Sequence, residues 1–302
     1  MNGSASRFKH LVGLDRTGLE DWAVEEIRGC CDQACFHGED PATEEEAIAR
    51  AQGADALLVS WRTPVTRRVI DACPDLRYIG MCCTLIDPAA ANVDVLHARS
   101  RGIEVKGIRD YGDEGLVEFI LAELIRLFHG FGPHHWSDKQ EELTGKTLGI
   151  LGFGVTGQML ADRAMAFGMD VLYHSRTRRP EREGPRVRHA SLETLLEQAD
   201  VVSTHVPRHT VLIDEAGFAR MKGPKVLVNT SLEPTFEVAP FREWLAQEGH
   251  FCIADRPGLG TPYEALSGLP RMITTPRVTG FTRQAEQRLS RKVVDNLRSV
   301  LA

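Results

Sequence analysis

One short run of glycines restricts the fold of this chain more than any other feature. The stretch TLGILGFGVTGQMLADRAMAFGMDVLYHS carries Gly152, Gly154 and Gly157 in the spacing G-x-G-x-x-G, between an aliphatic segment and a segment with helical spacing. A strand, such a loop, a helix and a second strand within about 30 residues are typical of a dinucleotide-binding Rossmann unit. The glycines permit the tight turn, the approach of a pyrophosphate and close helix–strand packing. We therefore expect this loop, including Val155 and Thr156 at the helix start, to bind dinucleotide phosphates.

The rest of the chain repeats the same alternation of short aliphatic runs and amphipathic segments. The runs that we interpret as buried strands span residues 10–14, 54–60, 76–81, 103–108, 147–152, 169–175, 200–206 and 225–231. Alternation of strands and helices predicts a parallel sheet with helices on both faces.

The alternation occurs twice, in residues 8–108 and 147–275, and a long apolar helix in EGLVEFILAELIRLFHGF connects the two sets. The predicted fold is α/β, with two Rossmann-like doubly wound parallel-sheet domains and a cleft between them. We expect residues 1–112 plus 282–302 to form a flavodoxin-like substrate domain. Residues 113–281 would form the dinucleotide-binding domain.

Composition limits the classes of partner that we expect for this protein. The 302 residues carry a formal net charge of −6, which argues against nucleic acid as a main partner. No apolar run approaches the roughly 18 residues that a membrane span needs, and the first residues lack the apolar stretch of a signal peptide. The seven cysteines lack metal-type pairing, so we expect no metal, reduced thiols and a cytoplasmic protein.

The residues after the second strand of the glycine-loop unit indicate which dinucleotide binds. An NAD site usually carries Asp or Glu there, roughly 20 residues beyond the loop, to accept a hydrogen bond from the ribose 2′-OH. This chain instead has Ser175, Arg176 and Thr177, followed by further arginines. Hydroxyl and guanidinium groups donate to a 2′-phosphate, so the pattern favours NADP, with NAD as the second possibility. The alternative interpretation is an ordinary solvated basic loop.

With these residues in place, the chain resembles the D-isomer-specific 2-hydroxyacid dehydrogenases. The resemblance runs through ELTGKTLGILGFGVTGQMLADRAMAFGMDVLYHSRT, SLETLLEQADVVSTHVP and ARMKGPKVLVNTS, and extends over nearly all of the chain. It implies an oxidoreductase that acts on a small-molecule substrate, usually as a homodimer joined through the cofactor domain. The HSRT stretch is similar to the NADP-using branch. The resemblance also implies cofactor contacts by His205, Val206, Pro207, Thr230 and Asp255.

The same resemblance locates three catalytic positions, and the expected groups are missing from them. Leu232 stands where the family has an Arg that binds the substrate carboxylate, and Arg277 stands where it has the proton-transferring His. The Glu that pairs with that His would fall at Gly260, with Glu264 a little further on. An arginine is a poor general acid because its pKa lies above about 12.

Two mechanisms are compatible with this departure. In one, Arg277 orients an anionic group while another residue or water supplies the proton. In the other, the substrate needs no such acid, as with a charged iminium or an activated C=C or C=N bond. A third possibility is a regulatory or sensor protein that keeps the dinucleotide site without catalysis.

Other polar residues are candidates for the substrate site. In IRDYGDEG, we assign Arg109 and Tyr111 as catalytic candidates, and Asp113 or Glu114 as either functional groups or helix caps. Tyr111 would need a lowered pKa to donate a proton readily.

Substrate contacts are predicted at the ends of two strands. Arg62 in SWRTP follows a strand at its carboxyl end, where open α/β sheets bind ligands, and would contact an anion or form a surface salt bridge. MCCTL occupies the place of the family's glycine-rich substrate loop, so Cys82, Cys83 and Thr84 are predicted to line the pocket together with Leu232.

Overall fold

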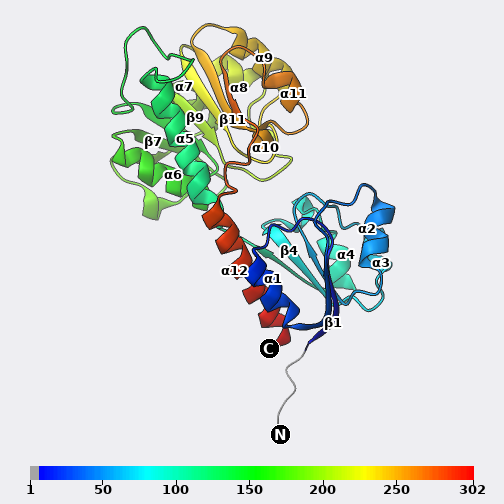
Figure 1. Cartoon of the computed structure of the whole chain (residues 1–302). Helices are drawn as coiled ribbons and strands as arrows, with labels where there is room; N and C mark the ends of the chain where they lie inside the picture. The colour runs from blue at the N-terminus through cyan, green and yellow to red at the C-terminus, as the bar shows by residue number, and fades with distance from the viewer. Residues whose placement is uncertain (1–6) are drawn as a thin grey trace. The chain divides into compact units, whose positions relative to one another are not determined.

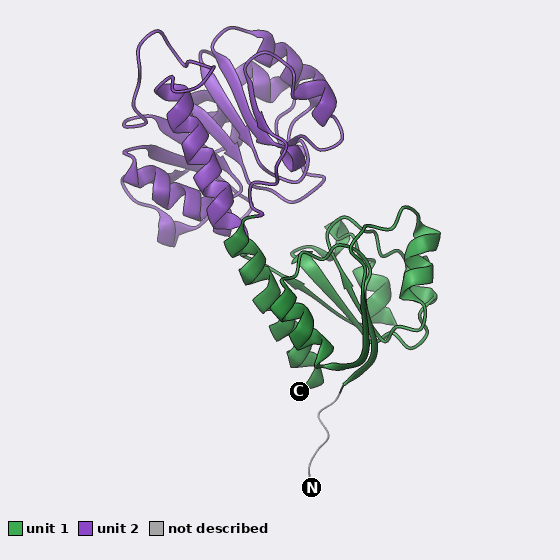
Figure 2. Ribbon diagram, in the orientation of Figure 1, with its two compact units in different colours: residues 1–111, 282–302 green, residues 112–281 purple. Residues whose placement is uncertain are grey.

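The computed structural model describes residues 7–302 and divides into two compact units (Figure 2). Unit 1 contains the chain up to Tyr111 together with Thr282–Ala302, and unit 2 is Gly112–Phe281. The sequence placed the boundary one residue later, after Gly112. Residues 1–6, which the predicted first domain included, lie outside the described residues. The assignment of unit 1 to the substrate and unit 2 to the cofactor stays a prediction.

Unit 1 is built on a five-stranded parallel sheet in the order β2-β1-β3-β4-β5. This is the strand order of flavodoxin-like doubly wound sheets. The strands are β1 Phe8–Gly13, β2 Cys31–Phe36, β3 Ala56–Val59, β4 Tyr78–Thr84 and β5 Glu104–Ile108. The helices are α1 Asp21–Arg28, α2 Glu44–Ala51, α3 Arg67–Asp71, α4 Val95–Ser100, α12 Arg283–Leu301 and the short 3-10 helix Pro88–Ala90.

Helices cover both faces of this sheet, as the alternation of strands and helices predicted (Figure 1). Leu57 and Leu58 are neighbours in β3 and point to opposite sides. Leu57 packs in a core with α2, α3 and α4, whereas Leu58 packs in a core with α1 and α12. The last helix of the chain therefore completes the unit that contains the first strand.

Unit 2 is built on a seven-stranded parallel sheet in the order β12-β11-β10-β9-β6-β7-β8. The strands are β6 Thr147–Leu151, β7 Asp170–His174, β8 Val187–His189, β9 Val201–Thr204, β10 Lys225–Asn229, β11 His250–Asp255 and β12 Met272–Thr275. The helices are α5 Asp113–Phe128, α6 Val155–Ala166, α7 Leu192–Gln198, α8 Glu215–Arg220, α9 Val238–Ala246, α10 Arg256–Leu259, α11 Tyr263–Leu266 and the 3-10 helix Pro180–Arg182.

This second sheet is also buried on both faces. Ile150 of β6 packs in a core with α5 and α6, whereas the next residue, Leu151, packs with α7, α8 and α9. No helix within residues 7–302 is long and apolar enough to cross a membrane.

Several helices begin where a side chain accepts a backbone N–H group of the first turn. Thr43, Thr66, Ser191 and Thr282 precede α2, α3, α7 and α12, and each accepts such a bond. These caps satisfy donors that a helix leaves without an internal partner.

All eight predicted strands exist, with ends that differ from the prediction by no more than three residues. The sequence missed β2, β8 and β12, which lie at sheet edges, and β11 beside β12. Edge strands bury less of their surface, so their sequences lack the continuous apolar run that marks a buried strand. β2, for example, has the sequence CDQACF and exposes or half-exposes most of its side chains.

One strand corrects a functional prediction. β4 continues through Cys82 and Cys83 to Thr84, so MCCTL is mainly strand and the predicted loop is wrong there. The Cys82 side chain lies in the core beneath α12, and that of Cys83 in the core on the other face. Burial raises the pKa of the Cys82 thiol well above its usual value. Two fully packed thiols leave no surface for a substrate, and only Thr84 is exposed.

Candidate active site

The carboxyl ends of the parallel strands in unit 2 create the candidate site. The chain moves from β6 outward to β7 and β8, and then returns to β9 on the other side of β6. Open α/β sheets bind ligands at such a switch point, outside the carboxyl ends of the strands. Gly152 follows β6 here, and His205 follows β9.

The three glycines of the loop have three different local environments. Gly152 has a φ of 95°, and a Cβ atom on it would lie 2.1 Å from the His205 carbonyl oxygen. A Cβ on Gly157 would lie 2.3 Å from the Gly152 carbonyl oxygen. Neither site accepts a side chain. A Cβ on Gly154, in contrast, would meet no atom of residues 7–302 within 4 Å. The structure therefore leaves space next to Gly154, where the pyrophosphate would lie.

Helix α6 begins at this open space without a side-chain cap. Gly154 occupies the N-cap position, and the first turn contains no acidic residue. The first N–H groups of the 12-residue helix, starting with that of Val155, are thus left for a ligand that carries negative charge. The hydroxyl of Thr156 donates to the Asp113 carboxylate instead, so Thr156 can offer the ligand only its backbone N–H.

The loop after β7 would contact the ribose that carries the 2′ group. The Ser175 hydroxyl donates to the Thr177 carbonyl oxygen at 2.6 Å, which tightens the turn. Arg176 is exposed, and within the described chain its guanidinium makes no hydrogen bond or ion pair. A guanidinium next to a helix-start phosphate site is suited to a further phosphate group.

The other arginines of this cluster are held by carboxylates. Arg178 binds Glu183 through two contacts of 2.7 Å, which lower the pKa of Glu183 to about 2. Arg182 pairs with Asp162 at 2.5 Å. The basic loop is thus mostly a set of internal ion pairs, and Arg176 is the member left for a ligand.

Two polar residues lie at the ends of neighbouring strands: Thr230 follows β10, and Asp255 is the last residue of β11. Thr230 is 7% exposed, and its hydroxyl has no partner among residues 7–302, so a bound cofactor could satisfy it. Asp255 is buried, and burial raises the pKa of its carboxyl group. That carboxylate accepts bonds from the N–H of Gly258 and from the N–H and hydroxyl of Thr279. It therefore caps α10 and holds the loop after β12, and its contact with the cofactor remains a prediction.

His205 is a neutral residue at neutral pH. Its Nε2 atom lies 2.9 Å from the Ser203 hydroxyl, and burial lowers the pKa of the imidazole to about 4. A histidine with that pKa is a weak candidate for donating a proton near neutrality. The next residue, Val206, donates its N–H to the Ser231 hydroxyl at 3.4 Å, and Pro207 is exposed.

The predicted catalytic positions of unit 2 lie at the same carboxyl edge. Leu232 follows β10 and is 41% exposed. Arg277 follows β12 and is exposed, with no partner for its guanidinium within the described chain. Glu264 pairs with Arg256 at 3.4 Å on the surface, with a side chain that is 80% exposed. Glu264 therefore belongs to a surface ion pair, whereas Leu232 and Arg277 follow strands at the carboxyl edge.

A histidine and a glutamate that the sequence did not assign to the site also meet at this edge. His209 follows β9, Glu233 follows β10, and the Nδ1 atom of His209 lies 3.0 Å from Oε2 of Glu233. Nothing local in the sequence connects the two residues. The one sequence feature that pointed to this pair was Glu233 in place of the glycine that the family resemblance predicts.

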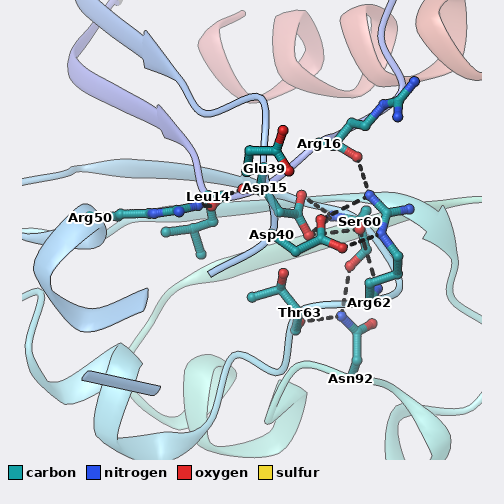
Figure 3. A network of polar contacts seen from close by, with 10 residues as sticks. All are labelled: Leu14, Asp15, Arg16, Glu39, Asp40, Arg50, Ser60, Arg62, Thr63 and Asn92. Carbon is teal, nitrogen blue, oxygen red and sulfur yellow. Dashed lines mark hydrogen bonds and ion pairs between the residues drawn. The ribbon is translucent and has the colours of Figure 1, made fainter. Parts of the chain in front are cut away.

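In unit 1, the predicted substrate residue Arg62 is held by its neighbours (Figure 3). Its Nε lies 2.7 Å and its Nη2 3.1 Å from the Asp40 carboxylate, and Nη2 also donates to the Arg16 carbonyl oxygen at 2.5 Å. The hydrogen bond from Arg62 lowers the pKa of Asp40. The salt-bridge interpretation thus describes this side chain, and substrate contact stays a prediction.

Next to Arg62 lies a buried carboxylate that sequence reasoning missed. Asp15 follows β1 and is 1% exposed. It accepts two contacts from the Ser60 N–H, at 2.9 and 3.2 Å, and one from the Ser60 hydroxyl at 2.7 Å (Figure 3). Asn92 donates to the carbonyl oxygens of Ser60 and Thr63, which fastens the same loop. The signal was an acid directly after the aliphatic run HLVGL.

The residues of the loop before α5 make mainly structural contacts. Arg109 is exposed and donates through Nε to the Leu85 carbonyl oxygen at 3.1 Å. Tyr111 packs against the core of unit 1, and its carbonyl oxygen accepts a bond from Arg288. Asp113 lies in the first turn of α5 without capping it, because Gly112 holds the N-cap position. Catalytic roles for Arg109 and Tyr111 remain predictions.

No group of three or more His, Cys, Asp or Glu residues in the described chain could hold a metal ion. The candidate groups at this edge are the glycine loop, Arg176, Thr230, Arg277 and the His209–Glu233 pair.

Comparison with known proteins connects this geometry to a family. Residues 129–239 match the sequence model of the D-isomer specific 2-hydroxyacid dehydrogenase, NAD binding domain. The chain is 31% identical over 275 residues to an (S)-sulfolactate dehydrogenase from Chromohalobacter salexigens, covering 84% of this chain and 87% of the relative. It is 28% identical over 305 residues to a hydroxypyruvate reductase from Blautia hydrogenotrophica, covering 93% and 92%.

Among solved structures, an acyclic imino acid reductase in complex with NADPH and D-Arg has the same fold. Its TM-score is 0.83 at 23% identity, and the match covers 97% of each chain.

Proposed function

Because the chain belongs to the D-isomer specific 2-hydroxyacid dehydrogenase family and is an NAD(P)-dependent oxidoreductase, we propose that it uses NADP(H) on a small anionic substrate, without the family's Arg, Glu and His. The observation that carries this proposal is Arg176, whose unpaired guanidinium follows the strand next to the phosphate loop.

The residues of unit 2 fit a nicotinamide dinucleotide. The open space at Gly154, the uncapped start of α6 and the unsatisfied hydroxyl of Thr230 each match a part of such a ligand. When bound, the cofactor would supply or accept a hydride. The protein supplies the phosphate contacts, the fixed position of the ligand and the polar groups beside the reacting carbon.

The substrate side of the proposal rests on Leu232 and Arg277. Leu232 cannot bind a carboxylate, but the Arg277 guanidinium is exposed and unpaired within the described residues, and can orient an anion. The relatives named above act on sulfolactate and hydroxypyruvate, which are small anions. The name of the imino acid reductase, which has the same fold, points to a C=N bond. We therefore include C=N substrates in the proposal beside C=O substrates. The proposed substrate class is therefore a small carboxylate or sulfonate with a reducible C=O or C=N bond.

Replacing Arg176 by Ala tests the choice of cofactor. The variant should bind NADPH at least about tenfold more weakly, because a charge-assisted bond is lost, and should bind NADH as before. Titration of intrinsic fluorescence with each dinucleotide measures both constants. Arg220→Ala removes an exposed arginine of α8 and is the matched control. Equal affinities for NADPH and NADH in the unchanged protein would exclude the NADP assignment.

Turnover is tested separately with a panel of 2-keto acids, cyclic imines and enones. Oxidation of NADPH with an anionic member of the panel supports the proposed activity. Tight cofactor binding without turnover of any class would favour a regulatory or sensor protein, which the missing Arg, Glu and His would then explain.

We also propose a cytoplasmic homodimer. The family resemblance supports the dimer, and the absence of disulfides among the seven described cysteines supports a reducing compartment. Light scattering on the purified chain tests the dimer.

A further inference from the structure

The pair formed by His209 and Glu233 is at the carboxyl edge of unit 2, where the proposed reaction would occur. β9 and β10 are adjacent parallel strands, so the loops that follow them leave the sheet side by side. The first of these loops begins with His205, beside Gly152. The second begins with Thr230 and contains Leu232 immediately before Glu233. The pair thus shares its two loops with the residues assigned to the cofactor.

The geometry of the pair suits proton transfer. The Nδ1 atom of His209 lies 3.0 Å from Oε2 of Glu233 in an ion-pair contact, so Nε2 remains for another partner. The His209 side chain is 69% exposed, so a substrate can reach it. The backbone of Glu233 is anchored, because its carbonyl oxygen accepts a bond from the Asn229 amide at 3.1 Å.

The backbone of His209 is also unusual. Its φ is 59°, and the described chain has two other non-glycine residues with positive φ, Asp110 and Arg271. Such a conformation costs about 1–3 kcal/mol and persists where the surrounding structure holds it, often at functional sites. Here it accompanies the contact between the His209 ring and Glu233.

The other histidine of the same loop, His205, is a poor proton donor near neutral pH. His205 is directed to Ser203, and burial lowers its pKa to about 4. The ring of His209 instead contacts Glu233, and Arg208 is its charged neighbour along the chain. Of the two imidazoles in this loop, that of His209 is therefore the one that lies exposed beside a carboxylate.

We propose that His209, positioned by Glu233, is the proton donor that replaces the missing histidine of the family. This inference rests on the proposed function. In the reductive direction, the substrate carbon gains a hydride as the nicotinamide is oxidised, and the π electrons of the C=O or C=N bond move to oxygen or nitrogen. That atom takes the proton from Nε2 of His209, which becomes neutral and regains a proton from water. In the oxidative direction the neutral ring accepts the proton.

The two members of the pair have different roles. His209 is the catalytic residue because it would touch the reacting atom, whereas Glu233 acts through His209 and is a positioning residue. The pair would take the place of the family's His and Glu, but from two loops that follow β9 and β10.

Four variants test the inference on the full chain. His209→Gln should lower kcat at least about 100-fold, the lower range for general acid–base catalysis, with NADPH affinity unchanged. Glu233→Gln should lower kcat less. It should also leave the KM for NADPH unchanged, because Glu233 acts on kcat only through the position of the His209 ring. His135→Gln and Glu264→Gln, which alter an exposed histidine and an exposed glutamate elsewhere in unit 2, are the matched controls.

The outcomes separate this inference from the proposed function. A fall in kcat for His209→Gln, together with a smaller fall in kcat at unchanged KM for Glu233→Gln, supports the pair. Turnover in the unchanged enzyme that His209→Gln retains within about threefold would overturn the pair and leave the proposed function standing. Absence of turnover in the unchanged enzyme, with every substrate class, would overturn the proposed function and the pair together.

Discussion

The two sheets of this protein have equivalent switch points, but the residues there are opposite in character. In unit 1, the crevice between β1 and β3 is closed by the protein itself, because the buried Asp15 carboxylate accepts the N–H and hydroxyl of Ser60. In unit 2, the crevice between β6 and β9 contains Gly152 against the His205 carbonyl oxygen, open space at Gly154 and a helix start without a cap.

The contrast shows that strand order alone does not make a nucleotide site. Both sheets place a switch point at their carboxyl edge, as doubly wound folds do. What differs is the residue that follows the first strand of each crevice. A carboxylate there repels a phosphate and binds the neighbouring loop, whereas a glycine lets backbone N–H groups face the ligand.

Two glycine substitutions should produce the largest difference between folding and binding. Gly152→Ala should lower the free energy of unfolding of unit 2 by about 4 kcal/mol or more, because the methyl group meets the His205 carbonyl oxygen at 2.1 Å and φ is 95°. Gly154→Ala, with a φ of −80° and no atom within 4 Å, should change it by less than about 0.5 kcal/mol.

Binding should separate the same two variants. Gly154→Ala should weaken NADPH binding at least about tenfold, since its methyl group occupies the space left for the pyrophosphate. Chemical unfolding and fluorescence titration measure the two quantities. A Gly154→Ala protein that binds NADPH with unchanged affinity would contradict the position assigned to the phosphates.

A substitution in the crevice of unit 1 should lower stability and leave NADPH binding unchanged. Asp15→Asn should destabilise unit 1 by about 2 kcal/mol, because it weakens buried hydrogen bonds to a charged acceptor. Hydrogen exchange should speed up in β1 and β3 and stay unchanged in β6 and β9. The matched control is Asp32→Asn, at a carboxylate whose side chain is 62% exposed. A large loss of NADPH affinity in Asp15→Asn would mean that the two crevices are not independent.

The smallest expected effect concerns two buried threonine hydroxyls that lack partners in the described chain, one in each unit. Thr63 is 3% exposed and Thr230 is 7% exposed. Replacing either by Val should raise the free energy of unfolding of the ligand-free protein by up to about 1 kcal/mol, because an unsatisfied buried group is removed.

Only one of these replacements should affect the cofactor. Thr230→Val should weaken NADPH binding by a few-fold, whereas Thr63→Val should leave it unchanged, and isothermal calorimetry distinguishes them. Equal losses in both variants would remove the argument that the Thr230 hydroxyl is kept for the ligand.

The sequence predicted the features that depend on local pattern. The glycine loop needs only its own spacing and the strand and helix beside it, and the α/β architecture follows from the alternation of aliphatic and amphipathic segments. The prediction that Leu232 and Arg277 replace the family's Arg and His also rests on position along the chain. The edge strands β2, β8 and β12 were missed because most residues of each are exposed or half-buried and no continuous apolar run marks them.

Tertiary structure decided how residues far apart in the chain combine. It extended β4 through Cys82 and Cys83, which turned predicted pocket residues into core residues. It paired Asp15 with Ser60, and His209 with Glu233, because adjacent parallel strands bring their carboxyl ends together whatever lies between them in sequence.

The same distinction between local pattern and tertiary contacts applies to the candidate site. The glycines and Ser175–Thr177 specify a dinucleotide by composition and spacing alone. Which arginine of this loop is left without a carboxylate partner, and which histidine of this edge has one, depend on ion pairs that form only in the folded chain.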